Sequence, residues 1–153
     1  MIIINMYSDG SSKCNPGESG IGIFMYFVSE NKLTIKFMEG YRIISTNNRM
    51  EMLSIIYALK KVLFSSKINI YTDSGYLYNH IIKRLHLWDC NNWHDFLYLR
   101  IMNIDLWKIL FSLLKVHLVS LRLVKSHNSD YGNEKADFLA NIAIEKKKKF
   151  WYS

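Results

Sequence analysis

Four carboxylates in this sequence stand where a rigid element of secondary structure would hold them. Two follow or end apolar runs that read as β-strands, and two lie near the start of predicted helices. In chain order they are Asp9, Glu51, Asp73 and Asp137. A single acid at such a place is usually a solvated turn residue or a partner of the helix dipole. Four in one cluster would repel one another by about 4 kcal/mol per pair at about 4 Å and an effective dielectric of about 20. If the fold gathers them, the chemistry they favour is the binding of hard divalent cations.

The elements that must position these acids follow from the hydrophobic periodicity. Apolar runs on either side of a polar turn at 29–32 predict an antiparallel meander, after which helices and strands alternate. The predicted strands are 2–8, 20–28, 33–44, 68–72 and 117–124, and the predicted helices are 47–63, 75–88, 103–114 and 133–147. This order indicates an α/β fold in which helices cover a mixed sheet. The first and fourth strands can be neighbours in such a sheet, which would bring Asp9 and Asp73 together.

The composition fits one domain and favours a polyanionic partner. The 153 residues carry a net charge of +7, which suits nucleic acid. Lys146 to Lys149 supply four of these charges, so the rest of the chain is only +3. A basic tail can also serve solubility alone. We expect a domain at 1–145 and a short Lys-rich tail at 146–153.

The cysteines and the apolar runs bear on the compartment. Cys14 and Cys90 lack the spacing of metal ligands, so we expect reduced thiols. No apolar run approaches the ~18 residues that a membrane span needs, and no signal-peptide pattern begins the chain. We therefore expect a soluble, cytoplasmic monomer that does not contact a membrane.

Four segments carry a resemblance to a known family. They are YSDGSSKCNPGESGIGI at 7–23, STNNRMEMLSIIYAL at 45–59, YTDSGYL at 71–77 and VKSHNSDYGNEKADFLA at 124–140. Together they resemble type 1 ribonuclease H, and the bacterial HI-like members in particular. The resemblance implies a ribonuclease H-like fold, with a five-stranded mixed sheet of order 3-2-1-4-5 and helices on both faces. It also implies an endonuclease that cleaves the RNA strand of an RNA–DNA hybrid.

The resemblance gives the four acids a role. In the family, acids at these motif positions hold two divalent cations, so the expected metal ligands are Asp9, Glu51, Asp73 and Asp137. Mg²⁺ is the expected ion, with Mn²⁺ as an alternative. Two ions ~3.5–4 Å apart can activate a water and stabilise the leaving oxygen. The expected products carry a 5′-phosphate and a 3′-hydroxyl.

Other residues match substrate-contacting positions of the family. They are Asn15, Thr46, Asn47 and Asn48. Trp93 is a further candidate, as a contact to the DNA backbone, and its alternative is a core residue. Contacts to 2′-hydroxyls on one strand would distinguish a hybrid from duplex DNA. Helix capping is an alternative for Asn47 and Asn48. We expect the first strand to end at Asp9, and Gly10 and Gly17 to let a nucleic-acid backbone approach the open loop that follows.

Two residues near the last helix also match family positions. His127 matches the catalytic-loop histidine, which assists proton transfer or the departure of ions and product; the alternative is an ordinary loop histidine. Asn128 and Ser129 follow it where the family usually has a glycine. Glu134 resembles an acid that tunes the second ion site. A partner of the helix dipole is an equally good role for Glu134.

Residues 83–103, here called the handle, depart from the bacterial pattern. In those relatives this region is a basic helix and loop that grips the DNA strand, whereas here three cations oppose two acids, for a net charge of +1. The Lys-rich tail could supply part of the missing attraction. Two rival functions stay open: a non-catalytic nucleic-acid-binding relative with the same fold, and a junction resolvase on the same scaffold.

Overall fold

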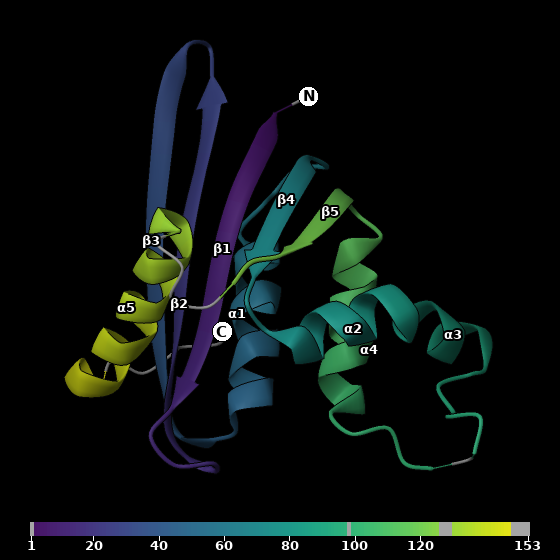
Figure 1. The fold of residues 1–153 in the computed structure, drawn as a ribbon. Helices are drawn as coiled ribbons and strands as arrows, with labels where there is room; N and C mark the ends of the chain where they lie inside the picture. The colour runs from purple at the N-terminus through teal and green to yellow at the C-terminus, as the bar shows by residue number, and fades with distance from the viewer. Residues whose placement is uncertain (1, 98, 126–129, 148–153) are drawn as a thin grey trace.

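Five strands form one mixed sheet in the computed structural model, which describes residues 2–97, 99–125 and 130–147 (Figure 1). The strands are β1 Ile3–Ser12, β2 Gly17–Ser29, β3 Lys32–Ser45, β4 Lys67–Thr72 and β5 Leu118–Leu123. Their order across the sheet is β3-β2-β1-β4-β5. The pairs β1–β2 and β2–β3 are antiparallel, whereas β4 runs parallel to both β1 and β5. The predicted mixed sheet and its strand order are confirmed.

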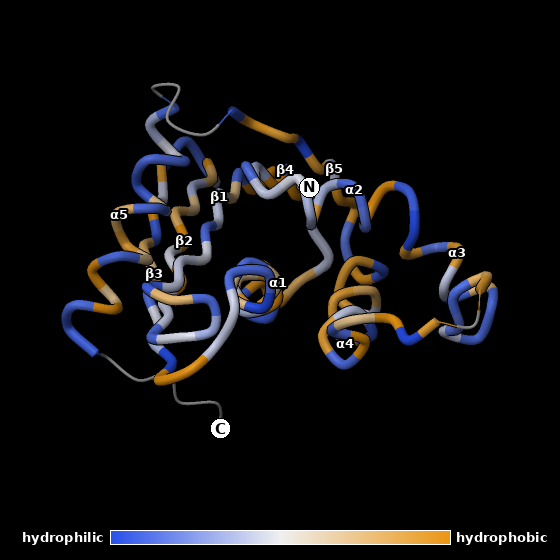
Figure 2. Tube along the Cα trace, turned by 60° about the horizontal axis from the view of Figure 1, so that its bottom comes forward, coloured by the Kyte–Doolittle hydropathy of each residue, from blue (hydrophilic) through white to orange (hydrophobic). Residues whose placement is uncertain are grey.

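Helices cover both faces of this sheet, also as predicted (Figures 1 and 2). They are α1 Asn47–Lys60, α2 Gly75–Lys83, α3 Leu85–Cys90, α4 Ile104–Leu114 and α5 Tyr131–Lys146. α1 packs on β1, β2 and α4, while α5 covers β1, β2 and β3 from the other side. The predicted helix 75–88 is divided at Arg84 into α2 and α3. Among the described residues, no helix combines the length and the apolar character that crossing a membrane requires.

The main core lies between the sheet and α1. Alternate residues of β2, Ile21, Ile23 and Met25, point into it, whereas Phe24 joins Tyr7 in a smaller cluster on the α5 face. Because both faces are covered, β2 reads as a nearly continuous apolar run. α1 contributes six apolar residues that are at most 1% exposed: Met50, Met52, Ile55, Ile56, Ala58 and Leu59.

α5 lies close to β2 because only small residues separate them. A Cβ atom added at Gly22 would overlap the backbone carbonyl oxygen of Ala136. Ala136, Ala140 and Ala143 of α5 are all fully buried. The backbone of the helix therefore approaches the strand directly at Gly22.

The first strand does not end at Asp9, so that prediction is wrong. β1 stays paired with β2 as far as Ser12, and the turn between them shrinks to residues 13–16. Gly10 lies inside the strand, where a Cβ atom would overlap the backbone nitrogen of Glu51. Its small size lets α1 approach β1, which is a packing role and not the opening of a loop for nucleic acid.

The boundaries of α1 also differ from the prediction. The helix ends at Lys60 and not at 63, and its N-cap is Thr46, whose Oγ1 accepts a hydrogen bond from the Arg49 backbone N–H at 3.4 Å. Asn47 and Asn48 are instead the first two helical residues, and both are exposed. Capping therefore does not occupy their side chains.

Candidate active site

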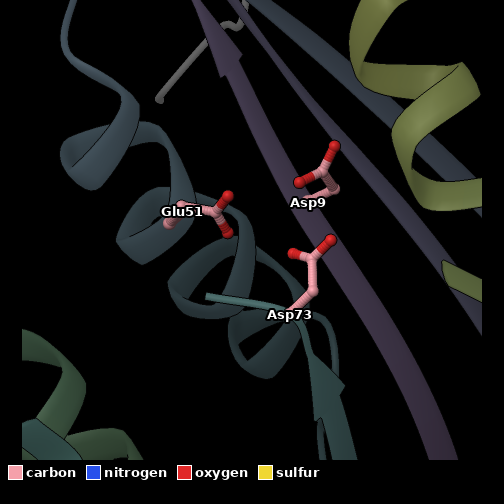
Figure 3. Close-up of side chains that lie close together, drawn as sticks. All are labelled: Asp9, Glu51 and Asp73. Atoms are coloured by element: carbon pink, nitrogen blue, oxygen red, sulfur yellow. The ribbon is translucent and has the colours of Figure 1, made fainter. Parts of the chain in front are cut away.

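Three carboxylates meet where β1 and β4 lie side by side, and Figure 3 shows them pointing toward one another. Asp9 belongs to β1 and Asp73 follows the last residue of β4. The parallel pairing of these strands aligns the two acids, two residues beyond the Tyr7–Tyr71 pair. Glu51 comes from the second turn of α1. Carboxylate oxygens of the three residues lie within 4.8 Å of one another.

Burial and mutual repulsion disfavour negative charge on this group. Two effects raise the pKa of Asp9 to about 6: burial, which is the larger, and the negative charge of Asp73. Burial, followed by the charge of Asp9, raises the pKa of Glu51 well above its ordinary value. Only 8% of the surface of each of these two residues is exposed. The group therefore resists full ionisation unless a positive charge joins it.

The donor set fits a hard divalent cation. Glu51 Oε2 is buried and has no hydrogen-bond partner in the part of the chain that the structure describes. Mg²⁺ takes oxygen ligands and is often bound through one or two carboxylates, with waters completing its shell. A cation among these oxygens would satisfy the orphaned Glu51 oxygen and cancel the repulsion.

Helix α5 brings two further acids to the same place. Asp137 and Glu134 line, together with the three acids, a cavity of about 300 Å³. Asp137 stands outside the tight group of three, although its charge adds to burial and to Asp73 in raising the pKa of Asp9. Asp137 Oδ1 accepts a hydrogen bond from Asn141 Nδ2 at 2.9 Å. All four predicted acids, and Glu134, therefore border one cavity.

Asn133 is a cavity residue that sequence reasoning missed. It lies in the first turn of α5 and is only 5% exposed. Its Nδ2 donates a hydrogen bond to Asp73 Oδ2 at 3.1 Å. The residue stands beside Glu134 in the NEKAD segment. An asparagine near a helix start usually signals a cap, and that ordinary interpretation hides its contact with a distant strand.

The predicted substrate-contacting amides lie at the start of α1 and in the adjacent β1–β2 turn. Asn47 lines it, and the Asn47 backbone N–H donates to Asn15 Oδ1 at 3.2 Å, which ties the β1–β2 turn to the start of α1. Asn15, Asn47 and Asn48 are all exposed. Thr46 is half-buried and occupied as the N-cap. Polar groups suited to a nucleic-acid backbone thus border the acids.

Trp93 lies apart from these residues, in the handle. Its half-buried ring packs edge-on against Phe111, with centroids 5.9 Å apart, and Lys108 Nζ stands 5.6 Å from its centroid. It does not line the acid cavity. Its described contacts are those of a residue that fixes the handle on α4.

The few cations of the handle are concentrated at one cleft. Lys83, Arg84 and Arg100 line an open cleft of about 520 Å³, with Asp95 and the buried Trp88 in its wall. The Trp88 indole Nε1 has no hydrogen-bond partner among the described residues. The handle therefore keeps a local positive surface although its total charge is small.

Two predictions fall wholly or partly outside the described residues. His127, Lys148 and Lys149 lie in segments that the structure does not describe. Of the tail, Lys146 and Lys147 are described; Lys146 ends α5, and Lys147 Nζ forms a salt bridge with Glu18 Oε1 at 3.0 Å.

The sequence and the fold both match known proteins. A sequence model described as RNase H matches residues 3–145. Ribonuclease H of Methylobacillus flagellatus is 38% identical over 143 residues, which cover 94% of this chain and 92% of that protein. The crystal structure of LC9-RNase H1, a type 1 RNase H with the type 2 active-site motif, superposes with a TM-score of 0.84 at 23% identity, over 95% of this chain and 74% of that one. LC11-RNase H1 in complex with RNA/DNA hybrid gives a TM-score of 0.70 at 20% identity, over 94% and 98%.

Proposed function

Because this chain belongs to the ribonuclease H family, we propose that it is an endonuclease that hydrolyses the RNA strand of RNA–DNA hybrids. The observation that carries this proposal is the convergence of Asp9, Glu51 and Asp73 within 4.8 Å, in a cavity that Asp137 also lines. Such a group of carboxylates has no folding rationale without a cation. The expected products end in a 5′-phosphate and a 3′-hydroxyl.

The metal ligands in this proposal are Asp9, Glu51, Asp73 and Asp137, with Mg²⁺ as the ion and Mn²⁺ as its substitute. Two divalent cations bound there would supply an activated water and stabilise the leaving oxygen. The four acids would hold those ions at the cavity that they line. Glu134, which lines the cavity, is proposed to tune the α5 side of the site.

The neighbouring polar surface suits the hybrid. Exposed Asn15, Asn47 and Asn48, with Thr46 beside them, are proposed to contact 2′-hydroxyls, base edges and phosphates of the RNA strand. The cationic cleft of the handle is proposed to contact the DNA strand. Trp93 is proposed to support that cleft, because its backbone N–H donates to the carbonyl oxygen of Trp88, a residue of the cleft wall, at 2.7 Å. LC11-RNase H1, which shares the fold, forms a complex with RNA/DNA hybrid, which supports a hybrid as the substrate class.

The remaining assignments stay proposals from the sequence. His127 is proposed to assist proton transfer or the departure of ions and product. Residues 1–145 are proposed to form the catalytic domain and 146–153 a basic tail. Cys14 and Cys90 are both unpaired and exposed, which agrees with a cytoplasmic protein, and we propose that it acts as a monomer.

The proposal is tested with hybrids labelled in turn on the RNA and the DNA strand, with Mg²⁺, Mn²⁺ or EDTA. Duplex RNA, duplex DNA and a four-way junction are the competing substrates. We expect metal-dependent cleavage of RNA in the hybrid alone, and none by Asp9→Asn. Tight hybrid binding without cleavage by the wild-type protein would instead indicate a non-catalytic relative, and preferential junction cleavage a resolvase.

A further inference from the structure

The side chain of Asn133 joins two elements that each supply an acid to the cavity. Its amide Nδ2 donates to Asp73 Oδ2 at 3.1 Å, so α5 is bonded directly to the carboxylate that follows β4. Asn133 also lies four residues before Asp137, hence on the same face of α5. One neutral side chain therefore links the Asp73 carboxylate to the helix that carries Asp137.

The start of α5 is fixed in a way that aims Asn133 at this carboxylate. The N-cap Asp130 Oδ1 accepts hydrogen bonds from the backbone N–H groups of Gly132 at 3.0 Å and Asn133 at 3.1 Å. A Cβ atom at Gly132 would lie 2.5 Å from the ring of Tyr7 in β1, so this turn is pressed onto the sheet. The backbone of Asn133 thus has little freedom, and its side chain is directed at the Asp73 carboxylate.

The hydrogen-bonding state of the amide argues against a purely stabilising role. Asn133 Oδ1 is buried and has no partner among the described residues. An acceptor left buried without a donor costs stability, which an apolar residue of similar size would avoid. The amide orientation is also determined, because exchanging its two ends would place Oδ1 against the Asp73 carboxylate oxygen. The useful property of this residue is therefore the neutral donor that it offers to Asp73.

We propose that Asn133 is a positioning residue that holds the Asp73 carboxylate in the orientation required for metal binding, an inference that rests on the proposed function. A neutral donor fixes the carboxylate without adding charge to a crowded anionic group. Outer residues of this kind typically change metal affinity or activity about 10–100-fold when removed.

The test compares Asn133→Ala with a control that loses a similar amide bond elsewhere. Asn69→Ala is that control, because Asn69 Nδ2 donates to Asn5 Oδ1 at 2.9 Å, in the same strand β4 but away from the cavity. Mn²⁺ binding to the substrate-free protein is measured by calorimetry, and hybrid cleavage is measured across a range of Mg²⁺ concentrations. We expect Asn133→Ala to bind Mn²⁺ about 10–100-fold more weakly. We also expect a lower kcat at limiting Mg²⁺ that recovers in excess Mg²⁺, with KM for the hybrid unchanged, whereas Asn69→Ala should match the wild type in each measurement.

The outcomes separate this inference from the proposed function. If the wild type binds metal and cleaves hybrid but Asn133→Ala behaves as Asn69→Ala does, the positioning role is wrong and the function stands. If the wild type shows neither property, both are wrong. Should Asn133→Ala fail to fold, Asn133→Ser, which keeps a polar group too short to reach Asp73, takes its place. Failure of both variants to fold would make Asn133 a structural residue and overturn the inference.

Discussion

Replacing Asp9 by asparagine should stabilise the metal-free protein while abolishing its hydrolysis of the hybrid. The pKa of Asp9 rises from its ordinary value near 3.8 to about 6 in the folded protein, chiefly because of burial and then because of Asp73. Between these values the folded state binds more protons than the unfolded state, so stability falls as the pH rises. The penalty is absent below the lower pKa and complete above the higher one.

The magnitude follows from the same two values. A difference of about 2 in pKa corresponds to about 3 kcal/mol at neutral pH, which is an upper value because Asp9 titrates together with its neighbours. Since Asn carries no charge, Asp9→Asn avoids this penalty. At ~2–4 °C per kcal/mol for a chain of this size, the melting temperature should rise by about 6–12 °C at most.

The assay is urea denaturation followed by circular dichroism, in EDTA, at pH 7.5 and at pH 4. We expect Asp9→Asn to be more stable than the wild type at pH 7.5, with most of the difference lost at pH 4. Asp89→Asn is the control, because Asp89 lies in the handle and pairs with Lys115 at 3.5 Å, so its neutralisation should give no such gain.

Repeating the stability measurement with Mg²⁺ in place of EDTA makes the test more stringent. Mg²⁺ at about 100 times its Kd should stabilise the wild type by about 2.7 kcal/mol and the variant much less. The difference in stability between the two proteins should therefore shrink or change sign. Equal stability of the two proteins at pH 7.5 in EDTA, or a difference that persists unchanged at pH 4, would refute the view that repulsion in this cluster opposes folding.

Three further predictions concern packing, catalysis and binding. Gly10→Ala should destabilise the protein in urea by about 3 kcal/mol or more, because the added methyl group meets the backbone of α1. The control Gly75→Ala adds its methyl group to open space and should cause no such loss, and a fully stable Gly10→Ala would contradict the close contact. His127→Ala should lower turnover on the hybrid by ~10²-fold or less with unchanged Mn²⁺ affinity by calorimetry, and loss of that affinity would make His127 a ligand. Changing Lys146 to Lys149 to glutamine should flatten the slope of log affinity against log salt by about one or two, at roughly 0.9 per phosphate contact, and an identical slope would exclude the tail from the substrate.

The sequence predicts best those features that are determined locally. Asp73 is placed correctly because the run INIYT is short, apolar and β-branched, and it stops where the acid begins. The extent of β1 beyond Asp9 was mispredicted because glycine and serine have low strand propensity. Pairing with β2 overrides that propensity. The segment 75–88 is divided at Arg84, where the backbone adopts φ −119° and ψ −38° and α3 turns away, which helical periodicity alone does not indicate.

The site shows the same division between local and long-range information. Motif resemblance named four acids that the structure places around one cavity, while their roles as ligands stay predictions. Asn133 escaped notice because its importance depends on Gly132 pressing the first turn of α5 onto β1, a contact between residues more than a hundred positions apart. No spacing within the last helix encodes that contact.

The bare contact between α5 and β2 has a consequence for how this protein can change over evolutionary time. Elsewhere in a core, a long side chain between two elements can rotate and absorb an added atom. Between Gly22 and Ala136 no side chain can rotate aside in this way, because the atom facing Gly22 is the backbone carbonyl oxygen of Ala136. An added methyl group would therefore push the whole helix as one body, and the displacement would reach Asp137, the next residue, undiminished. A position in the middle of the sheet is therefore expected to restrict sequence change through packing alone.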